Sequence, residues 1–237
     1  MKKINWIDHG INMISVILGV SLAFLVGNYA QEESYKAEAE FVISSLLEEV
    51  ESDIDSYDDY QIPDNEEKAA QLKRALGFMD EGKEMDSVVY LLANGALHIN
   101  NYYPSNITLN SILSSGKLDI VRDFGLRKDL MIYRANSEEV KFQGQAQVDF
   151  FTNQLIPWYL ENPEFFESQG SESINAEAYT LFNLYYSFLW NKTEKYKSIL
   201  KDAQNLQKNL INYQISEGFE IEIHSKDSTS LNSEIGR

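Results

Sequence analysis

Residues 10–30 read GINMISVILGVSLAFLVGNYA, and this stretch decides how the rest of the chain is arranged. It contains 21 residues and no Lys, Arg, Asp or Glu. As an α-helix it is about 31 Å long, which matches the hydrocarbon thickness of a bilayer. Two lysines, Lys2 and Lys3, precede it. We therefore predict a transmembrane anchor over residues 10–30.

The charges on the two sides of the anchor predict its orientation. Lys2 and Lys3 lie before it, whereas Glu32 and Glu33 follow it with only Lys36 nearby. The cytoplasmic flank of a membrane helix carries the excess of Lys and Arg. Residues 1–9 are therefore expected in the cytoplasm and everything after residue 30 outside it.

A secretory signal peptide has the same basic start and apolar middle, so cleavage is the alternative. A cut after Ala30 places Asn28 at the −3 position, where a small residue is needed. The segment Ser21-Leu22-Ala23 fits the small-x-small rule better, but it lies inside the apolar run. These positions favour an uncleaved anchor.

Small residues recur at every fourth position of the anchor, at Ser15, Gly19, Ala23 and Gly27. This spacing places them on one side of a helix, where small side chains let two membrane helices approach closely. Gly and Ser are also common in membrane helices without such a role. Four in register favour a packing face, and Asn12 and Asn28 are expected to form hydrogen bonds across it.

Composition bounds what the remaining 207 residues can form. The chain is 43% apolar and 12% aromatic, which is typical of one folded domain with its own core. It contains no Cys, so disulfides, thiolate metal sites and a Cys nucleophile are excluded.

The charge of the chain is strongly acidic and uneven. Residues 1–30 hold one of the 37 acidic and two of the 20 basic residues, so residues 31–237 carry a net charge of −18. Such a surface repels the phosphate backbone, and no nucleic acid is expected as a partner.

The part after the anchor is predicted to be all-α. Apolar residues recur at helical spacing from residue 39 to residue 57, so the anchor helix is expected to continue to about residue 60 with an acidic outer face. The segment Ile62-Pro63-Asp64-Asn65 is predicted to end it, with Asp64 and Glu67 arranged as a capping box. Further helices are expected over about 65–81, 86–99, 107–115, 125–156 and 175–213, with a break near Asn191 left open.

The segments between and after these helices give weaker patterns. Residues 117–121 alternate in a way compatible with a strand, and residues 157–170 form an aromatic-rich connection. The predicted organisation is a cytoplasmic segment over 1–9, the anchor over 10–30, an extracytoplasmic helical bundle over 31–216 and a flexible polar tail over 217–237.

No catalytic, metal or cofactor motif is found. His9, His98 and His224 lie far apart in the predicted topology, and no metal site or catalytic triad can be built from them. The acidic run from Asp53 fails the calcium-loop pattern, because Asp58 stands where that pattern needs Gly. The motifs of serine hydrolases, phosphate-binding loops and zinc proteases are missing from the sequence. We therefore expect a protein that is no enzyme and has neither cofactor nor metal.

Aromatic residues gather between Trp158 and Trp190. They can form a bundle core, a ligand groove or a surface resting on the membrane. A core is favoured, and the interleaved acids Glu161, Glu164 and Glu167 argue against membrane contact.

Three stretches together resemble an uncharacterised bacterial family of single-span proteins. They are the anchor pattern IxVILGVxLAFLVGNYAQE, the segment from Asn106 to Ile120 (NITLNSILSSGKLDI) and a closing Lys-rich helix. The family is known only as a domain of unknown function. The resemblance implies an anchored helical domain and supplies no catalytic residues. It also places the chain in a bacterial inner membrane with a periplasmic domain.

Two functions remain open from the sequence. The first is a non-enzymatic interaction or scaffold subunit, assembling through its anchor and emerging helix with a second copy or with another membrane protein. The second is an extracytoplasmic ligand-binding module that reports to a partner.

A charge pattern predicts which helix covers the emerging one. Residues 192–208 carry five lysines and two acids, whereas residues 31–67 carry 14 acids and one lysine. We predict that residues 39–57 and 195–211 lie antiparallel, with their apolar stripes buried together and unlike charges along the rim.

Overall fold

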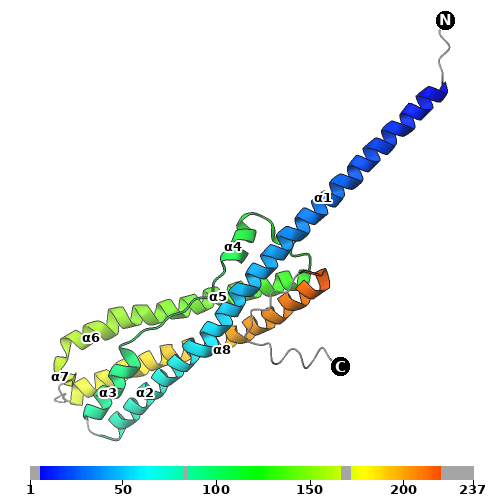
Figure 1. The fold of residues 1–237 in the computed structure, drawn as a ribbon. Helices are drawn as coiled ribbons and strands as arrows, with labels where there is room; N and C mark the ends of the chain where they lie inside the picture. Colours follow the sequence, from blue (N-terminus) through cyan, green and yellow to red (C-terminus); the bar gives the residue numbers. More distant parts are fainter. Residues whose placement is uncertain (1–5, 83–84, 167–171, 220–237) are drawn as a thin grey trace, which may run out of the picture.

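The structure is a computed structural model, and it describes residues 6–82, 85–166 and 172–219. Figure 1 shows an elongated bundle from which one long helix projects. The helical elements are α1 (Trp6–Asp55), the π-helical turn η1 (Ser56–Gln61), α2 (Ile62–Asp80), α3 (Met85–Ala96), α4 (Ile107–Ser114), the 3₁₀ turn η2 (Leu118–Ile120), α5 (Phe124–Phe150), the π-helical turn η3 (Phe151–Leu155), α6 (Ile156–Glu161), α7 (Pro163–Phe166) and α8 (Glu172–Glu217). No strand occurs within the described ranges, so the all-α prediction is confirmed.

Helix α1 joins the predicted anchor to the bundle without a break. Its N-terminal half stands clear of the other helices, and its C-terminal half lies among them (Figure 1). Among the described residues, one helical stretch, Met13–Asp80, is long and apolar enough to cross a membrane by its length and composition, and it contains α1 from Met13 onward.

The predicted helix end at Pro63 is wrong, because a π-helical turn carries the chain past the proline. The Ile62 N–H donates to the carbonyl of Tyr57, and α2 then begins with Pro63 in its first turn. Proline is tolerated there because its missing N–H has no partner within the helix. Asp64 forms no capping box; its carboxylate accepts a hydrogen bond from Lys68 Nζ at 2.6 Å.

The same arrangement occurs a second time, at Pro157. The π-helical turn η3 precedes Ile156-Pro157, and α6 begins there with proline in its first turn. The predicted irregular connection over 157–170 is therefore helical at Ile156–Glu161 and again at Pro163–Phe166. Residues 167–171 lie outside the described residues.

Most other helix boundaries agree with the sequence pattern. Gly82 and Gly116 follow α2 and α4 with φ of 64° and 71°, the left-handed conformation that ends helices. Residues 118–120 form a 3₁₀ turn instead of the extended segment that alternation suggested. Helix α8 is continuous through Asn191, so the break left open there is not present.

Two apolar clusters fill the bundle. The cluster nearer the anchor joins α1, α4, α5 and the C-terminal half of α8. The distal cluster joins α2, α3, α6, α7 and the N-terminal half of α8. Helix α8 thus runs through both clusters and connects them (Figure 1).

The predicted pairing of α1 with α8 is confirmed. The rings of Tyr57 and Tyr196 lie 5.0 Å apart, and Gln207 Nε2 donates to Glu51 Oε1 at 3.2 Å. Further along, Gln214 Nε2 donates to Ser44 Oγ at 3.3 Å. Along this contact the residue numbers increase on α8 while those of their partners decrease from Tyr57 to Ser44, so the two helices are antiparallel.

The predicted charge pairing along that contact is wrong. Lys195 pairs with Glu139 on α5 at 2.5 Å, and Lys197 pairs with Glu66 on α2 at 2.8 Å. The face of α8 toward α1 is apolar, so these lysines lie on its flanks and meet other helices. Exposed pairs of this kind contribute only ~0.2–1 kcal/mol each.

The folded domain extends slightly beyond the predicted boundary at residue 216. Phe219 is buried, and its ring lies 6.1 Å from that of Tyr213 on α8. The rest of the predicted tail, residues 220–237, lies outside the described residues.

Two glycines provide a test of packing in the distal cluster. A Cβ on Gly95 of α3 would lie 2.7 Å from Leu72 Cγ and 3.0 Å from the Lys68 carbonyl oxygen, whereas a Cβ on Gly77 of α2 would meet nothing within 4 Å. We expect Gly95→Ala to lower the free energy of unfolding by ~1–3 kcal/mol through overpacking. The control Gly77→Ala should raise it by ~0.5–1 kcal/mol. Urea denaturation checks both, and equal effects would contradict the close α2–α3 contact.

Candidate functional site

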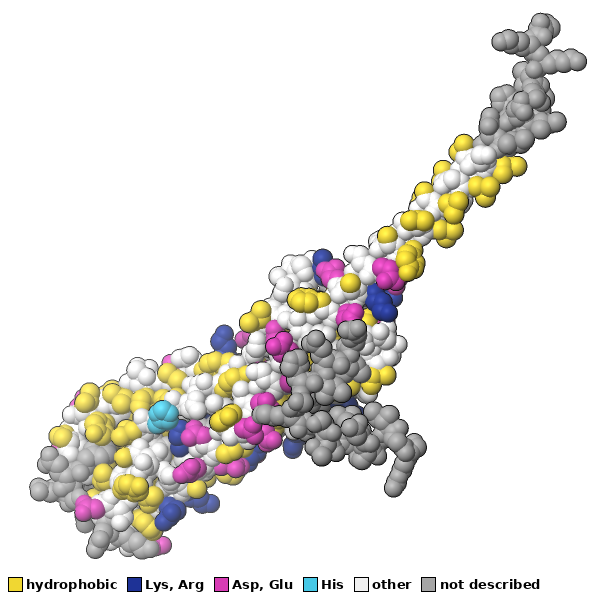
Figure 2. All heavy atoms as spheres, in the orientation of Figure 1, with side chains coloured by type: hydrophobic (Ala, Val, Ile, Leu, Met, Phe, Trp, Pro, Cys, Tyr) yellow, Lys and Arg dark blue, Asp and Glu magenta, His cyan; other side chains and the backbone are white. Residues whose placement is uncertain are grey.

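The anchor face is the first candidate site. Ser15, Gly19, Ala23 and Gly27 are all exposed on α1, and a Cβ on either glycine would meet nothing within 4 Å. Figure 2 shows apolar side chains around the projecting part of α1 and charged ones where it meets the bundle. The structure thus places the four small residues on a surface that no other described part of the chain covers.

Asn12 and Asn28 were predicted to form hydrogen bonds across this face. The side chain of Asn12 lies outside the described residues. Asn28 is exposed, but it follows Ala23 by five residues and lies about 140° around the helix from it. A contact through the four small residues would therefore leave Asn28 outside it.

A short segment after α4 braces α1 just beyond the anchor. Tyr35 Oη donates to the Asp119 carbonyl at 2.7 Å, and Lys117 pairs with Glu38 at 2.5 Å. Arg122 pairs with Glu32 at 2.7 Å, and its guanidinium lies 4.5 Å from the centre of the Tyr35 ring. Residues 32–38 of α1, just after the predicted anchor, are thereby attached to the bundle.

A buried carboxylate is the centre of the second candidate site. Asp53 on α1 is fully buried and accepts hydrogen bonds from Tyr133 Oη at 2.6 Å and Tyr102 Oη at 2.7 Å. The Ser105 N–H donates to it at 3.1 Å. Three donors from two other parts of the chain thus converge on one side chain of α1.

Burial shifts the pKa values of Asp53 and of the two tyrosines that donate to it. Burial raises the pKa of Asp53, while its hydrogen bonds from Tyr133, Tyr102 and Ser105 oppose that rise. Burial also raises the pKa of Tyr133 and raises the pKa of Tyr102 to about 12. Both tyrosines therefore keep their protons at neutral pH and act as donors.

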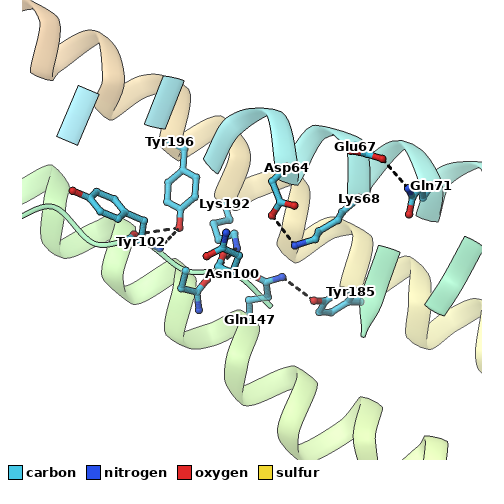
Figure 3. A network of polar contacts seen from close by, with 11 residues as sticks. Asp64, Glu67, Lys68, Gln71, Asn100, Tyr102, Gln147, Tyr185, Lys192 and Tyr196 are labelled. Atoms are coloured by element: carbon cyan, nitrogen blue, oxygen red, sulfur yellow. Dashed lines mark hydrogen bonds and ion pairs between the residues drawn. The ribbon is translucent and has the colours of Figure 1, made fainter. Parts of the chain in front are cut away.

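A buried amine lies further along α8. Lys192 Nζ donates to the Asn100 carbonyl and to Asn101 Oδ1, both at 3.0 Å (Figure 3). Burial, helped by the nearby charge of Lys68 and opposed by Asp64, lowers the pKa of Lys192 to about 7.

Asp53 and Lys192 hold the same irregular segment, residues 97–106, which we call the strap. Tyr196 Oη donates to the Tyr102 carbonyl at 3.2 Å, and a Cβ on Gly144 of α5 would lie 2.9 Å from the Tyr103 ring. At the end of the strap, Glu49 accepts hydrogen bonds from the N–H and hydroxyl of Thr108 at 2.9 and 2.7 Å. These polar groups are used to hold the strap between α1, α5 and α8.

The sequence analysis missed this buried polar cluster. Asp53 lies between Val50 and Tyr57 at helical spacing, and Lys192 lies between Leu189 and Tyr196 in the same way. A charged residue within an apolar helical stripe is the signal that points to a buried polar group.

The remaining titratable residues form no candidate site in the described structure. His98 is exposed, and no group of three or more His, Asp or Glu is placed to hold a metal ion among the described residues. In the acidic run that starts at Asp53, Asp55, Asp58 and Asp59 are exposed on the helix.

The aromatic part of α8 mainly fills the distal core. Phe182 and Tyr185 are buried, and Tyr185 Oη accepts a hydrogen bond from Gln147 Nε2 at 2.9 Å (Figure 3). The interpretation of these aromatics as a core is confirmed for Trp158, Phe165, Phe182 and Tyr185, whereas Trp190 is 48% exposed. Beside them lies an open depression of about 440 Å³, whose aromatic lining is Phe142, Phe150 and Phe188.

Comparison of the chain with protein-family models, with curated proteins and with solved structures gave no match. The resemblance to a bacterial single-span family stays a prediction.

Proposed function

We propose that this chain is a non-enzymatic interaction subunit of a bacterial inner membrane. In this proposal residues 10–30 cross the membrane with the N-terminus in the cytoplasm, and the bundle lies in the periplasm. Its partners are the lipid bilayer and either a second copy or another membrane protein. The function consists of assembly through α1.

One observation supports this proposal more than any other. Helix α1 passes without interruption from an uncovered apolar surface at residues 13–30 to a buried stripe in the bundle, at Ala39, Ile43, Leu46 and Val50. The braces at Tyr35, Glu32 and Glu38 attach it where it leaves the anchor. A helix packed against the anchor is thereby mechanically connected to the whole bundle.

The ligand-binding alternative receives less support. Phe182 and Tyr185, which would line its pocket, pack into the distal core. Asp53 and Lys192, the buried charged groups beside the strap, are already hydrogen-bonded within the chain. We therefore place the function on the exposed surface of α1.

The test is a pair of substitutions on the small-residue face. We expect Gly19→Leu with Gly27→Leu to weaken association in mild detergent by about tenfold or more, because leucine keeps two backbones apart. Ser21→Leu is the matched control, since Ser21 is an exposed small residue on the other side of the helix. Light scattering of the purified full chain measures the mass. A monomeric parent, or equal masses for all variants, would contradict assembly through this face.

A further inference from the structure

A small pocket lies where α1 leaves the bundle, between α1, the turn before α5 and the end of α8. Its volume is about 230 Å³, and its polar lining is Glu32, Tyr35 and Lys36 of α1, Arg122 of the turn, and Tyr213 and Glu217 of α8. In Figure 1 the start of α5 and the end of α8 lie at the end of the bundle from which α1 projects. Figure 2 shows acidic and basic side chains close together at this junction. Sites for drug-sized ligands measure ~300–1,000 Å³, so this pocket suits a smaller polar group.

The proposed anchoring brings this pocket to the level of the lipid headgroups. The headgroup layer extends about 5–7 Å beyond the hydrocarbon on each side of a bilayer. In a helix along the membrane normal, Glu32 and Tyr35 stand about 3 and 8 Å beyond Ala30. Arg122 contacts both of them, through its ion pair with Glu32 and through its guanidinium over the Tyr35 ring. Tyrosine is enriched at this level of membrane proteins.

Several groups in the lining have bonding capacity that the chain itself does not use. Lys36 and Glu217 form no hydrogen bond or ion pair with any described residue. Tyr213 is 8% exposed; its Oη accepts from the Arg122 N–H at 3.1 Å, and no described residue accepts its own proton. The Arg122 guanidinium has five N–H donors, of which its hydrogen bond to Glu32 uses one. The pocket therefore presents N–H and O–H donors together with a carboxylate acceptor.

The charges of the pocket balance, although the chain as a whole is strongly acidic. Two cations, Lys36 and Arg122, and two carboxylates, Glu32 and Glu217, give a net charge of zero, whereas the whole chain carries −17. A simple anion would meet the two carboxylates, and a simple cation would meet the amine and the guanidinium. A ligand that has both a phosphate and an amine is complementary to both sets of charges.

We propose that this pocket binds the headgroup of a membrane phospholipid that carries a phosphate and a primary amine, as phosphatidylethanolamine does. The inference rests on the proposed membrane anchoring. Arg122 and Lys36 bind the phosphate, because their N–H groups form charge-assisted hydrogen bonds with phosphate oxygens. Tyr213 donates its hydroxyl proton to the same phosphate, and Glu217 accepts hydrogen bonds from the ammonium. Binding then holds the bundle against the membrane surface at the base of α1.

The test measures which phospholipid the purified full chain retains in mild detergent. Phosphatidylethanolamine and phosphatidylglycerol, which share the phosphate and differ in the amine, are added in equal amounts and counted by native mass spectrometry. Glu217→Gln and Lys36→Gln each remove one charge of the pocket, and neither breaks an interaction within the described structure. Glu33→Gln and Lys128→Gln are the matched controls, because both residues are exposed near the same end of the bundle and do not line the pocket.

We expect the parent to retain phosphatidylethanolamine at least about tenfold more than phosphatidylglycerol, because only the former gives Glu217 a charged donor. Glu217→Gln should bring the two lipids within about twofold of each other, and Lys36→Gln should weaken retention of both by about fivefold or more. The control variants should match the parent. Equal retention of both lipids by the parent would overturn the proposal, as would controls that lose as much as the pocket variants.

A soluble ligand with the same chemistry is distinguished by adding glycerophosphoethanolamine, which is the headgroup without acyl chains. We expect the lipid to stay bound at an equimolar amount of it, because the acyl chains keep the lipid beside the anchor. Displacement would make a soluble compound the ligand and overturn the lipid assignment.

Membrane fractionation of the parent separates this proposal from the proposed function. A parent that is found in membranes but shows no lipid preference overturns the headgroup site alone. A parent that is absent from membranes overturns the anchoring, and the headgroup site with it.

Discussion

Asp53→Ala is expected to lower the free energy of unfolding by about 3 kcal/mol or more, one of the two largest effects we predict. The substitution leaves Tyr102 Oη, Tyr133 Oη and the Ser105 N–H without their acceptor inside the bundle. Each buried donor left unpaired costs ~1–3 kcal/mol. The strap loses its attachment to α1 at the same time.

Two further variants make the Asp53 prediction specific. Asp53→Asn keeps one carbonyl oxygen as acceptor and loses the second, so its cost should be about half that of Asp53→Ala. Asp58→Ala removes an exposed acid on the same helical stretch and should change stability by less than about 0.5 kcal/mol. Urea denaturation of the full chain in mild detergent, followed by circular dichroism, gives all three values. Equal stability of the Asp53→Ala and Asp58→Ala proteins would show that the cluster contributes nothing.

The second large effect is a rise in stability with pH that depends on Lys192. In the unfolded chain this lysine has its ordinary pKa near 10.5, whereas in the folded chain burial lowers it to about 7. Between these values the unfolded state binds the additional proton, so the free energy of unfolding rises with pH. The penalty for burying the amine is full below pH 7 and is relieved toward pH 10.5. Its size is on the order of a few kcal/mol, since one pKa unit corresponds to about 1.4 kcal/mol.

The measurement is a series of urea denaturations between pH 7 and about 9.5. The series stops at that pH because tyrosines ionise above it. Burial raises the pKa of Tyr185 and Tyr196 in the folded chain to about 12, so the unfolded state loses these protons first and the free energy of unfolding then falls with pH. Lys192→Met should remove most of the slope. Lys195→Met, on an exposed lysine paired with Glu139, should retain it. A slope that survives unchanged in Lys192→Met would mean that this amine is not the titrating group.

Several features of the fold follow from local sequence and were predicted correctly. The helices and most of their ends depend on apolar spacing and on glycines such as Gly82 and Gly116, which act within one or two turns of the chain. The pairing of α1 with α8 was predicted from their opposite charges, but the two helices are held together by apolar burial, and the lysines of α8 meet other helices. The prediction of an anchor depends only on residues 10–30 and their flanks, since a helix satisfies its own backbone in lipid.

Other features depend on contacts that sequence spacing does not reveal. A π-helical turn decided that the helical path continues past Ile62-Pro63. This turn shifts the register so that Pro63 lies in the first turn of α2. The rim lysines of α8 met α5 and α2 because the rotation of α8 was fixed by burying its apolar face.

The buried polar cluster shows most clearly what the tertiary structure alone decided. By charge pattern alone, Asp53 belongs to an acidic helix surface and Lys192 to a basic one, although each lies within an apolar stripe. Their partners, Tyr133 and Asn100, lie 80 and 92 residues away along the chain. Such a charge is tolerated in the interior only where donors or acceptors from distant segments converge on it. The sequence by itself therefore determined most of the helical segments and which stretch suits a membrane, while the packing of α1, α5 and α8 around the strap decided which charges are buried.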